Sequence, residues 1–326
     1  MSEREWDDEI AAAAEVLRGG GLVAFPTETV YGLGADATNV DALARLYAVK
    51  GRPVDHPVIV HLADAAALDD WAADVPECAR VLADAFWPGP LTVIVRRSAR
   101  VPDAVTGGRA TVGLRVPDQP VALALLRAFG GGVAAPSANR FGRVSPTTAA
   151  DVRVDLGADV DLVLDGGPCR VGVESTIVDC TADPPVIARV GGLPRQAIEA
   201  ALGRPVAVAD RGTVAAPGTL AAHYAPRARV HVVDVATAGA RAGELLAAGR
   251  RVGVLALERP AGLPHAVEIL DAPVDVDEYA RVLYLRLREA DTRALDDLLV
   301  VPPPAGGLGD AVADRVGRAA AAEPGS

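Results

Sequence analysis

Residues 22–34 read Leu-Val-Ala-Phe-Pro-Thr-Glu-Thr-Val-Tyr-Gly-Leu-Gly, and this stretch gives the clearest indication of the fold. The apolar run from Leu22 to Phe25 is typical of a short buried strand. Pro26 ends that strand because proline has no N–H to donate, and the two glycines that follow allow a tight return of the chain. Thr27 and Thr29 then lie at the carboxyl end of a strand, where open α/β sheets bind ligands. The alternative is a plain turn in which both threonines bond backbone groups.

Helical and strand-like patterns alternate along the rest of the chain, which predicts an α/β protein. In the first part, helices are expected over 5–18, 39–48, 76–86, 119–128, 147–156 and 194–202, and strands over 22–25, 58–62, 91–96, 111–116, 132–135, 161–165, 175–180 and 185–189. Residues 204–227 have no convincing apolar period, so we interpret them as a linker. Beyond it we expect strands over 229–234, 251–256 and 298–301, and helices over 237–248, 276–290 and 308–320. The predicted division is a catalytic domain at 1–203, a linker or lid at 204–227, and a second α/β domain at 228–326.

Composition narrows the functional class. The formal net charge of −11 argues against a broad nucleic-acid-binding surface, because phosphate neutralisation supplies most such affinity. The acidic start lacks the layout of a signal peptide, and no stretch reaches about 18 uninterrupted apolar residues, so we expect no membrane contact. The three scattered cysteines indicate neither a zinc site nor a disulfide framework and fit a reducing compartment. We therefore expect a soluble, cytoplasmic enzyme or adaptor.

Lys50 is the only lysine, against 31 arginines. Arginine is a planar fork of donors whereas lysine is a compact point charge, so a lone lysine indicates a position that a guanidinium would not fill. Lys50 and Arg52 follow a helix end closely, with His56 just after them, and two such cations would suit a triphosphate. The alternative is a solvated cation that the helix dipole favours at a C-terminus.

Two predicted strands carry further polar candidates. Arg115 comes two residues after Gly113, so both face the same side of strand 111–116. An inward-facing arginine in an apolar strand needs an anion, which is either a ligand or a structural Asp or Glu. His61, near the end of strand 58–62, is either a ligand contact or a hydrogen-bonded, half-buried histidine.

Residues 134–139, Ala-Ala-Pro-Ser-Ala-Asn, form a strand that proline breaks into a loop of small residues. The loop leads through Ser145 to a helix that begins near Thr147. Small side chains let backbone N–H groups approach a ligand, and a helix N-terminus attracts phosphate. Asn139 is one of only two asparagines, and the other, Asn39, is explained as a helix cap.

Other candidates lie downstream. Ser175 opens a strand and Arg189 ends the next one. His223 and Tyr224, in the linker, either reach back over the first domain as a lid or dock the linker through the tyrosine. The sequence matches no Walker loop, dinucleotide motif, zinc motif or Ser-His-Asp arrangement. Its hydroxyls and cations instead suit the positioning and charge neutralisation of phosphates.

Five motifs, in this order, resemble the YrdC-like family. They are Pro-Thr-Glu-Thr-Val-Tyr-Gly-Leu-Gly at 26–34, Lys-Gly-Arg-Pro at 50–53, Pro-Val-Ile-Val-His at 57–61, Pro-Ser-Ala-Asn at 136–139 and Val-Glu-Ser-Thr-Ile at 173–177. The chain length and the His-Tyr-Ala-Pro linker at 223–226 resemble the family's longer branch, the L-threonylcarbamoyladenylate synthases. The resemblance implies a YrdC-like twisted mixed α/β sheet around a concave site, with a smaller Rossmann-like C-terminal domain behind the linker.

The resemblance also implies a reaction. L-threonine, bicarbonate or CO2, and ATP would give threonylcarbamoyl-AMP and pyrophosphate. A separate tRNA-modifying complex would then transfer the threonylcarbamoyl group to an adenosine of tRNA, without strong direct nucleic-acid binding by this chain. Mg²⁺ would arrive with the ATP, and no dedicated metal ligands are expected.

The same resemblance assigns residues by motif position. The residues expected to bind L-threonine are Thr27, His61, Thr111, Arg115 and Ser175. Those expected to bind ATP are Lys50, Arg52, His56, Ala135, Ser137, Asn139, Ser145 and Arg189, with His223 and Tyr224 closing over it. Lys50 and Arg52 are the expected catalytic residues, because they would stabilise charge on the leaving pyrophosphate.

The sequence departs from the family pattern at two places, and two rival functions stand beside the main one. His56 replaces the usual asparagine, which predicts a pH-sensitive contact, and the linker lacks the usual methionine and basic residues before His223. One rival is a YrdC-like module that makes carbamoyl-adenylate for hydrogenase maturation. The other is a non-enzymatic RNA- or ribosome-binding module, which the acidic balance disfavours.

Overall fold

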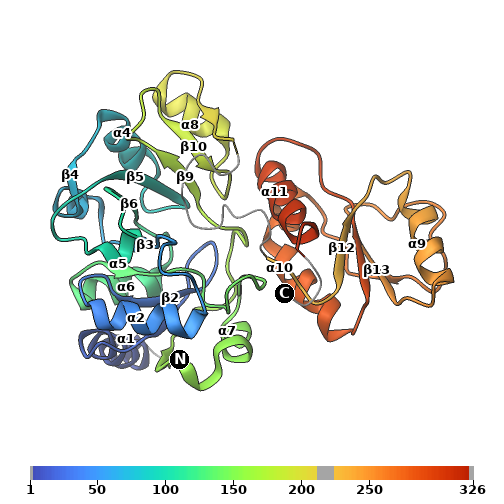
Figure 1. Ribbon diagram of the computed structural model, residues 1–326, viewed down its shortest axis with the longest axis horizontal. Coiled ribbons are helices and arrows are strands. Elements are labelled where there is room, and N and C mark those ends of the chain that lie inside the picture. The colour runs from blue at the N-terminus through green and yellow to red at the C-terminus, as the bar shows by residue number, and fades with distance from the viewer. Residues whose placement is uncertain (1–2, 211–223, 323–326) are drawn as a thin grey trace. The chain divides into compact units, whose positions relative to one another are not determined.

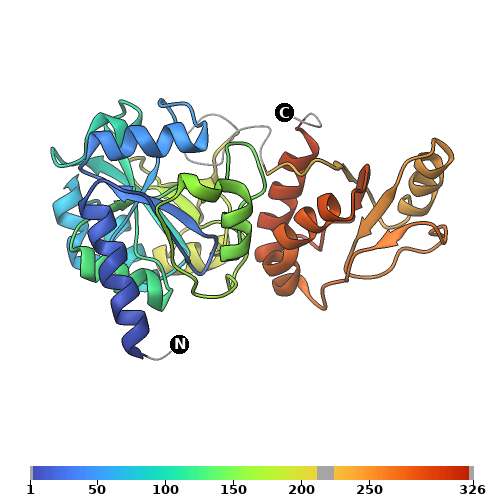
Figure 2. The same cartoon turned by 90° about the horizontal axis from the view of Figure 1, so that it is seen from below.

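The computed structural model describes residues 3–210 and 224–322, which divide into two compact units. The first unit contains the described residues of 1–141, 145–170 and 174–219. The second contains those of 142–144, 171–173 and 220–326. Figures 1 and 2 show the helices and strands of each unit from two directions.

The elements of the first unit alternate as the sequence pattern predicts. Its helices are α1 Glu3–Arg18, α2 Val40–Lys50, α3 Leu68–Trp71, α4 Glu77–Phe86, α5 Asp103–Thr106, α6 Pro120–Phe129, α7 Ala149–Leu156 and α8 Arg195–Leu202. Its strands are β1 Val23–Phe25, β2 Gly32–Asp36, β3 Ile59–His61, β4 Ala72–Asp74, β5 Leu91–Arg97, β6 Thr111–Arg115, β7 Val133–Ala134, β8 Leu162–Val163, β9 Thr176–Asp179, β10 Val186–Arg189 and β11 Ala207–Val208.

These strands form one mixed sheet. Eleven strands take part, in the order β11-β10-β9-β5-β6-β3-β7-β2-β1-β8, with β4 paired to β5. Strands β3 and β6 are parallel, whereas β5 and β6 are antiparallel and β5 and β9 are parallel again. The expected mixed α/β sheet is therefore confirmed. Its centre is the run β9-β5-β6-β3, which brings together segments that lie far apart in the chain.

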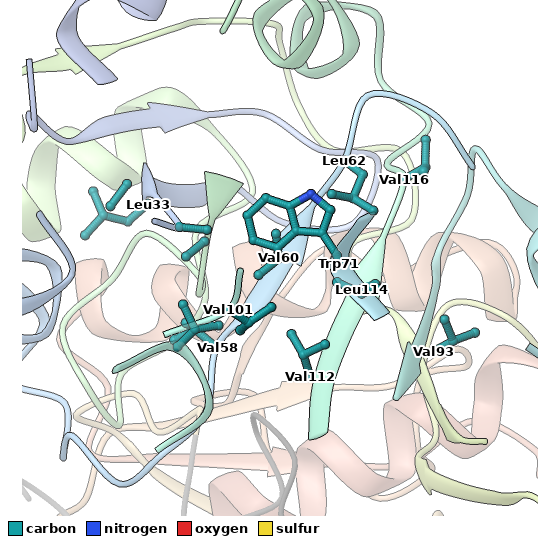
Figure 3. Close-up of a cluster of buried hydrophobic side chains, with 14 of the residues drawn as sticks. Leu33, Val58, Val60, Leu62, Trp71, Val93, Val101, Val112, Leu114 and Val116 are labelled. Carbon is teal, nitrogen blue, oxygen red and sulfur yellow. The ribbon is translucent and has the colours of Figure 1, made fainter. Parts of the chain in front are cut away.

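Side-chain alternation gives the central strands two different faces. Val60, Val112 and Leu114 point into a buried apolar cluster around Trp71, drawn in Figure 3. Successive residues of a strand face opposite sides of the sheet. Ile59 and His61 of β3, and the odd-numbered residues of β6, therefore lie on the other side, which we call the site face. At the β1 and β7 end, an apolar cluster that includes residues of α1 and α6 covers this same side.

The second unit is a smaller α/β domain. Its strands are β12 Arg229–Val232, β13 Val252–Leu255, β14 Glu268–Ile269 and β15 Asp297–Val300, in the order β12-β15-β13-β14. Every pairing in this sheet is parallel. Its helices are α9 Ala238–Ala247, α10 Val276–Thr292 and α11 Leu308–Ala320. A parallel sheet that alternates with helices confirms the expected Rossmann-like architecture.

The prediction of a tight return of the chain after Phe25 is wrong. Gly32 and Gly34 instead belong to strand β2, which pairs antiparallel with β1 so that Phe25 lies opposite Gly32. A Cβ on Gly34 would lie 2.9 Å from the Phe25 ring and 2.8 Å from Val133. These glycines therefore provide room for close packing rather than a turn conformation, and the actual return is the six-residue loop between the two strands.

Short strands account for other differences from the predictions. The sequence pattern gave no sign of β4, β14 or β11, and β11 lies inside the range interpreted as a linker. Strands of two or three residues carry too few side chains for an alternating pattern to show. Within the described residues, no helix is both long and apolar enough to cross a membrane.

Candidate active site

The site face carries a cleft at the centre of the first sheet. Its empty volume is about 310 Å³ with the open solvent at its mouth included, and it is lined by Pro57, Val58, Ile59, Thr92, Ile94, Arg109, Thr111, Gly113 and Ile177. The residues from β3, β5, β6 and β9 include the predicted Thr111. At the carboxyl ends of the parallel strands β3 and β6, His61 lies directly opposite Arg115 in the sheet register. Two predicted site residues are thus neighbours on one face.

Arg115 is the centre of a buried polar cluster. It is 4% exposed, and its Nη2 donates to the Thr29 hydroxyl at 2.9 Å and lies 2.7 Å from a Glu28 carboxylate oxygen. The Thr29 hydroxyl is 2.8 Å from that of Thr27, which bonds the Val30 carbonyl at 2.6 Å. The arginine thus has a glutamate partner, the Thr27 hydroxyl bonds a backbone carbonyl, and the Thr29 hydroxyl accepts from the guanidinium.

His61 is fully buried rather than half-buried. It is 3% exposed, its ring meets the Phe25 ring edge-on at 5.9 Å, and its Nδ1 has no hydrogen-bond partner among the described residues. Burial, followed by the positive charge of Arg115, lowers the pKa of His61 from 6.5 to about 3. The imidazole is therefore neutral at physiological pH.

Lys50 occupies the last turn of α2, and its side chain is buried. It is 2% exposed, which excludes the solvated helix-terminal cation. Its Nζ donates to the carbonyl oxygens of Ser137 and Asn139, both at 2.6 Å, and lies 3.5 Å from the Asn139 side-chain oxygen. Burial, followed by the nearby Arg52 charge, holds the pKa of Lys50 well below its usual value. An anion beside this ammonium would offset that electrostatic penalty.

The loop that Lys50 binds is also attached to the threonine loop. Backbone hydrogen bonds run from Leu33 to the Pro136 carbonyl at 2.8 Å and from Ala138 to the Tyr31 carbonyl at 2.8 Å. Ala135 donates to the Ile59 carbonyl at 2.9 Å, which continues the edge of β3. The small residues of 134–139 therefore connect the Lys50 side chain to the segment that carries Thr27 and Thr29.

Arg52 and His56 lie together around an aromatic ring. The Arg52 guanidinium donates to the Pro57 carbonyl at 2.9 Å and stands 5.9 Å from the centre of the Phe141 ring. The His56 ring is 5.7 Å from the same ring centre. Partial burial, followed by the Arg52 charge, lowers the pKa of His56 from 6.5.

Ser175 links two strands at the site. Its hydroxyl is 2.8 Å from that of Thr92, and the Arg189 guanidinium donates to its carbonyl at 2.8 Å and to its hydroxyl at 3.1 Å. All three side chains are buried. Arg189 therefore holds the entry to β9, beside the Ile177 wall of the cleft.

Ser145 and the linker residues complete the predicted set. The buried Ser145 hydroxyl donates to a Glu174 carboxylate oxygen at 2.7 Å. His223 lies outside the described residues. Tyr224 is 1% exposed and belongs to the second unit, where its ring stacks on Tyr284 at 5.5 Å with the Arg315 guanidinium 5.3 Å from it. Tyr224 thus packs the described end of the linker against Tyr284 and Arg315 of the second unit. The expected contact of Tyr224 with ATP stays a prediction.

Sequence reasoning offered Thr29 beside Thr27, but it did not name three other polar residues as site residues: Glu28, Thr92 and Glu174. Glu28 and Thr29 lie inside the motif that identified Thr27, and the need of Arg115 for an anion was the available signal for Glu28. Thr92 is a hydroxyl in an apolar strand, and only the sheet register brings it to Ser175. Nothing in the sequence marks a register between strands so far apart.

The arrangement combines anion-binding groups with hydroxyls in one unit. A guanidinium lies beside two threonines, an ammonium lies by the loop of small residues, and a second guanidinium lies close enough to that ammonium to lower its pKa. The described residues contain no group of three or more His, Cys, Asp or Glu side chains placed to hold a metal ion. The ligand-binding roles of the individual residues stay predictions at this point.

Comparisons with known proteins match both units. Residues 15–191 match the Sua5–YciO–YrdC family model, described as "Telomere recombination", and residues 193–321 match the model described as "Threonylcarbamoyl-AMP synthase, C-terminal domain". A threonylcarbamoyl-AMP synthase of Bacillus subtilis is 42% identical over 96% of this chain and 93% of its own length. One of Pyrococcus abyssi is 42% identical over 97% and 94%. The structure of P. abyssi Sua5 complexed with L-threonine superimposes with a TM-score of 0.89 at 40% identity, covering 96% of this chain and 94% of that one.

Proposed function

The chain belongs to the Sua5/YrdC family as a two-domain enzyme of the threonylcarbamoyl-AMP synthase kind, and on that premise we propose that it joins L-threonine, bicarbonate or CO2, and ATP into threonylcarbamoyl-AMP with release of pyrophosphate. The enzyme class is that of a nucleotidyl-transferring synthase. We propose both the identity of its substrates and the residues that bind them.

L-threonine is proposed to bind beside Arg115. Its guanidinium is buried on the site face, and a buried guanidinium prefers a carboxylate that can meet it edge to edge. The neutral His61 and the hydroxyl of Thr27 offer hydrogen-bonding groups to a β-hydroxy amino acid. The relative of known structure that binds L-threonine supports this assignment at 40% identity.

ATP is proposed to bind along the loop that Lys50 anchors. Lys50 and Arg52 supply positive charge next to the small residues Ser137 and Asn139, and small side chains allow backbone groups to approach phosphates. Ser145 and Arg189 are proposed to contact the nucleotide as well. Mg²⁺ is proposed to bind only as a counter-ion of the triphosphate, whose negative charge it would neutralise.

The chemistry that such a site supports is an in-line displacement. The neutral amine of threonine adds to CO2, which forms the N–C bond of a carbamate and releases one proton. A carbamate oxygen then attacks the α-phosphorus, and the bond from that phosphorus to the bridging oxygen of pyrophosphate breaks. Lys50 and Arg52 would stabilise negative charge on the departing pyrophosphate. Positioning and electrostatics suffice for this step, since no covalent enzyme intermediate is required.

One observation carries the proposal: Arg115 stands on the site face with two threonine hydroxyls and His61 around it, at the carboxyl end of a strand whose continuation lines the cleft. These groups would suit a small molecule that bears a carboxylate and a hydroxyl. Downstream, we propose that a separate complex transfers the threonylcarbamoyl group to an adenosine of tRNA, with the cytoplasm as the compartment.

The test is to incubate the purified chain with ATP, Mg²⁺, labelled bicarbonate and each amino acid in turn, and to follow the labelled carbon into nucleotide products. We expect one labelled adenylate, formed only with L-threonine. In a parallel reaction with ATP and labelled carbamoyl phosphate, labelled adenylate formed without threonine would identify a carbamoyl-adenylate synthase. RNA binding without any labelled adenylate would identify a binding module, and either result would refute the proposal.

A further inference from the structure

Glu28 is a buried carboxylate with an incomplete set of partners. Its side chain is 1% exposed, yet neither carboxylate oxygen accepts a hydrogen bond from any described residue. One oxygen lies 2.7 Å from Arg115 Nη2, so the two charges touch, but the N–H bond is not directed at that oxygen. A buried carboxylate without hydrogen bonds is costly, which argues that the position serves more than packing.

The contact differs from the pairing expected of an arginine that serves only as a structural cation. A carboxylate usually meets a guanidinium through two parallel N–H···O bonds. Here the ion pair joins Glu28 to Nη2, the same Nη2 donates to Thr29 at 2.9 Å, and Nε donates to the Gly89 carbonyl at 3.4 Å. Nη1 donates no hydrogen bond to a described residue. Glu28 therefore holds the guanidinium from one side and leaves its other edge for a second carboxylate.

The charges of the pair also set which ligand fits. Arg115 and Glu28 together are neutral, and both are buried, so the pocket has little net charge to offer a simple anion. An amino acid brings one carboxylate and one ammonium. Its carboxylate would face the guanidinium, and its ammonium would be attracted by the negative charge of Glu28. Inside a protein such attractions are stronger than in water.

We propose that Glu28 is a positioning and specificity-determining residue that makes the amino-acid pocket electrically neutral, so that the pocket selects a zwitterion over a carboxylic acid without an ammonium group. This inference rests on the proposed function, since it assumes that the amino acid binds at Arg115. Glu28 acts through Arg115 and through its charge, and it need not touch the ligand.

The test compares two ligands that differ only in the ammonium group: L-threonine and (R)-3-hydroxybutanoate, which keeps the carboxylate and the hydroxyl. Dissociation constants are measured by titration calorimetry for the wild-type chain and for Glu28→Gln. We expect the wild type to prefer threonine, and Glu28→Gln to reduce that preference by on the order of tenfold, because the uncharged amide no longer attracts the ammonium. The unneutralised Arg115 should at the same time bind 3-hydroxybutanoate as well as before or better.

Two further variants isolate the charge of Glu28. Glu28→Asp keeps the charge and should keep the preference within about threefold, so a folded Glu28→Asp variant without preference would overturn the proposal even if Glu28→Gln failed to fold. Asp297→Asn removes a buried carboxylate of the second unit, which pairs with Arg250, and should leave the preference unchanged.

Failure of the inference about Glu28 can be distinguished from failure of the proposed function. An equal loss of affinity for both ligands in Glu28→Gln would show a purely structural role and overturn the inference. An unchanged preference in that variant would do the same. A wild-type chain that binds no threonine would overturn the proposed function, and this inference with it.

Discussion

The Nζ of Lys50 lies 2.6 Å from the carbonyl oxygen of Asn139. The side chain of the only lysine thus ends inside the loop proposed to bind ATP. There it bonds Asn139, one of the two asparagines in the chain. A second bond of the same length reaches the Ser137 carbonyl. An ammonium in this position shapes the loop and places a positive charge beside it.

Lys50→Arg should reduce adenylate formation by about 10²-fold or more, the scale seen when one charge-stabilising donor is removed from a site. A planar guanidinium cannot reproduce two bonds of this length from one compact nitrogen within a side-chain position that is 2% exposed. Steady-state turnover, with circular dichroism to confirm the fold, measures the effect.

The matched control for this variant is Arg45→Lys on the same helix. Arg45 pairs with Asp161 at the surface, at 2.6 Å and 42% side-chain exposure, so the reverse exchange there should leave turnover within about twofold. Wild-type turnover in Lys50→Arg would show that the lone lysine is incidental.

The buried His61 makes the stability of the chain depend on pH. Its pKa is lowered from 6.5 to about 3 in the folded state. Below pH 6.5 the unfolded chain takes up a proton that the folded state does not. The contribution of His61 is therefore complete above pH 6.5 and falls between pH 6.5 and 3, by up to about 1.4 kcal/mol per pH unit.

His61→Gln should accordingly be less sensitive to acid than the wild type. Urea unfolding at pH 7 and pH 5 should show that the variant loses about 2 kcal/mol less stability over this interval than the wild type. The comparison uses each protein as its own reference, so any general destabilisation by the substitution cancels. Parallel losses in the two proteins would contradict the burial of a neutral imidazole.

His56 should make ATP binding depend on pH. Burial and Arg52 lower its pKa in the free chain, so the neutral ring predominates near pH 7. Triphosphate charge favours the protonated ring, so ATP binding should be assisted by proton uptake as the pH falls. The wild type should therefore gain ATP affinity relative to His56→Asn between pH 7.5 and 5.5. The ratio of the two dissociation constants measures this, and a ratio independent of pH would refute a contact between His56 and the phosphates.

The two asparagines should respond in opposite ways. Asn39 caps α2, where its side-chain oxygen accepts from Asp41 and Ala42 at 3.0 and 3.1 Å. Asn39→Ala should lower the free energy of unfolding by about 1 kcal/mol and leave turnover of the folded enzyme unchanged. Asn139→Ala should mainly raise the KM for ATP. Denaturant unfolding and steady-state kinetics on both variants check the pair, and loss of turnover in folded Asn39→Ala would contradict the division of roles.

Long periodic elements could be predicted from the sequence, and their register could not. The strands β5 and β6 and the Asn39 cap of α2 follow from local sequence patterns, and the structure bears them out. The glycines at 32 and 34 predict a turn because glycine weakens strands, whereas in β2 they make room for Phe25.

The same distinction applies to the site. Motif position selected Arg115, His61 and Lys50, but pairing strands and loops far apart in sequence gave them their partners. The bonds of Lys50 Nζ to backbone carbonyls, and the contact of Glu28 with Arg115, depend on tertiary packing that no local pattern records.

The most direct test of the central claim is pyrophosphate release from ATP, measured with purified chain and Mg²⁺ while threonine and bicarbonate are each omitted in turn. The account predicts release that requires both compounds, with one pyrophosphate formed for each labelled carbonate carbon recovered in threonylcarbamoyl-AMP. Release at the same rate without threonine, or no release with all substrates present, would contradict it.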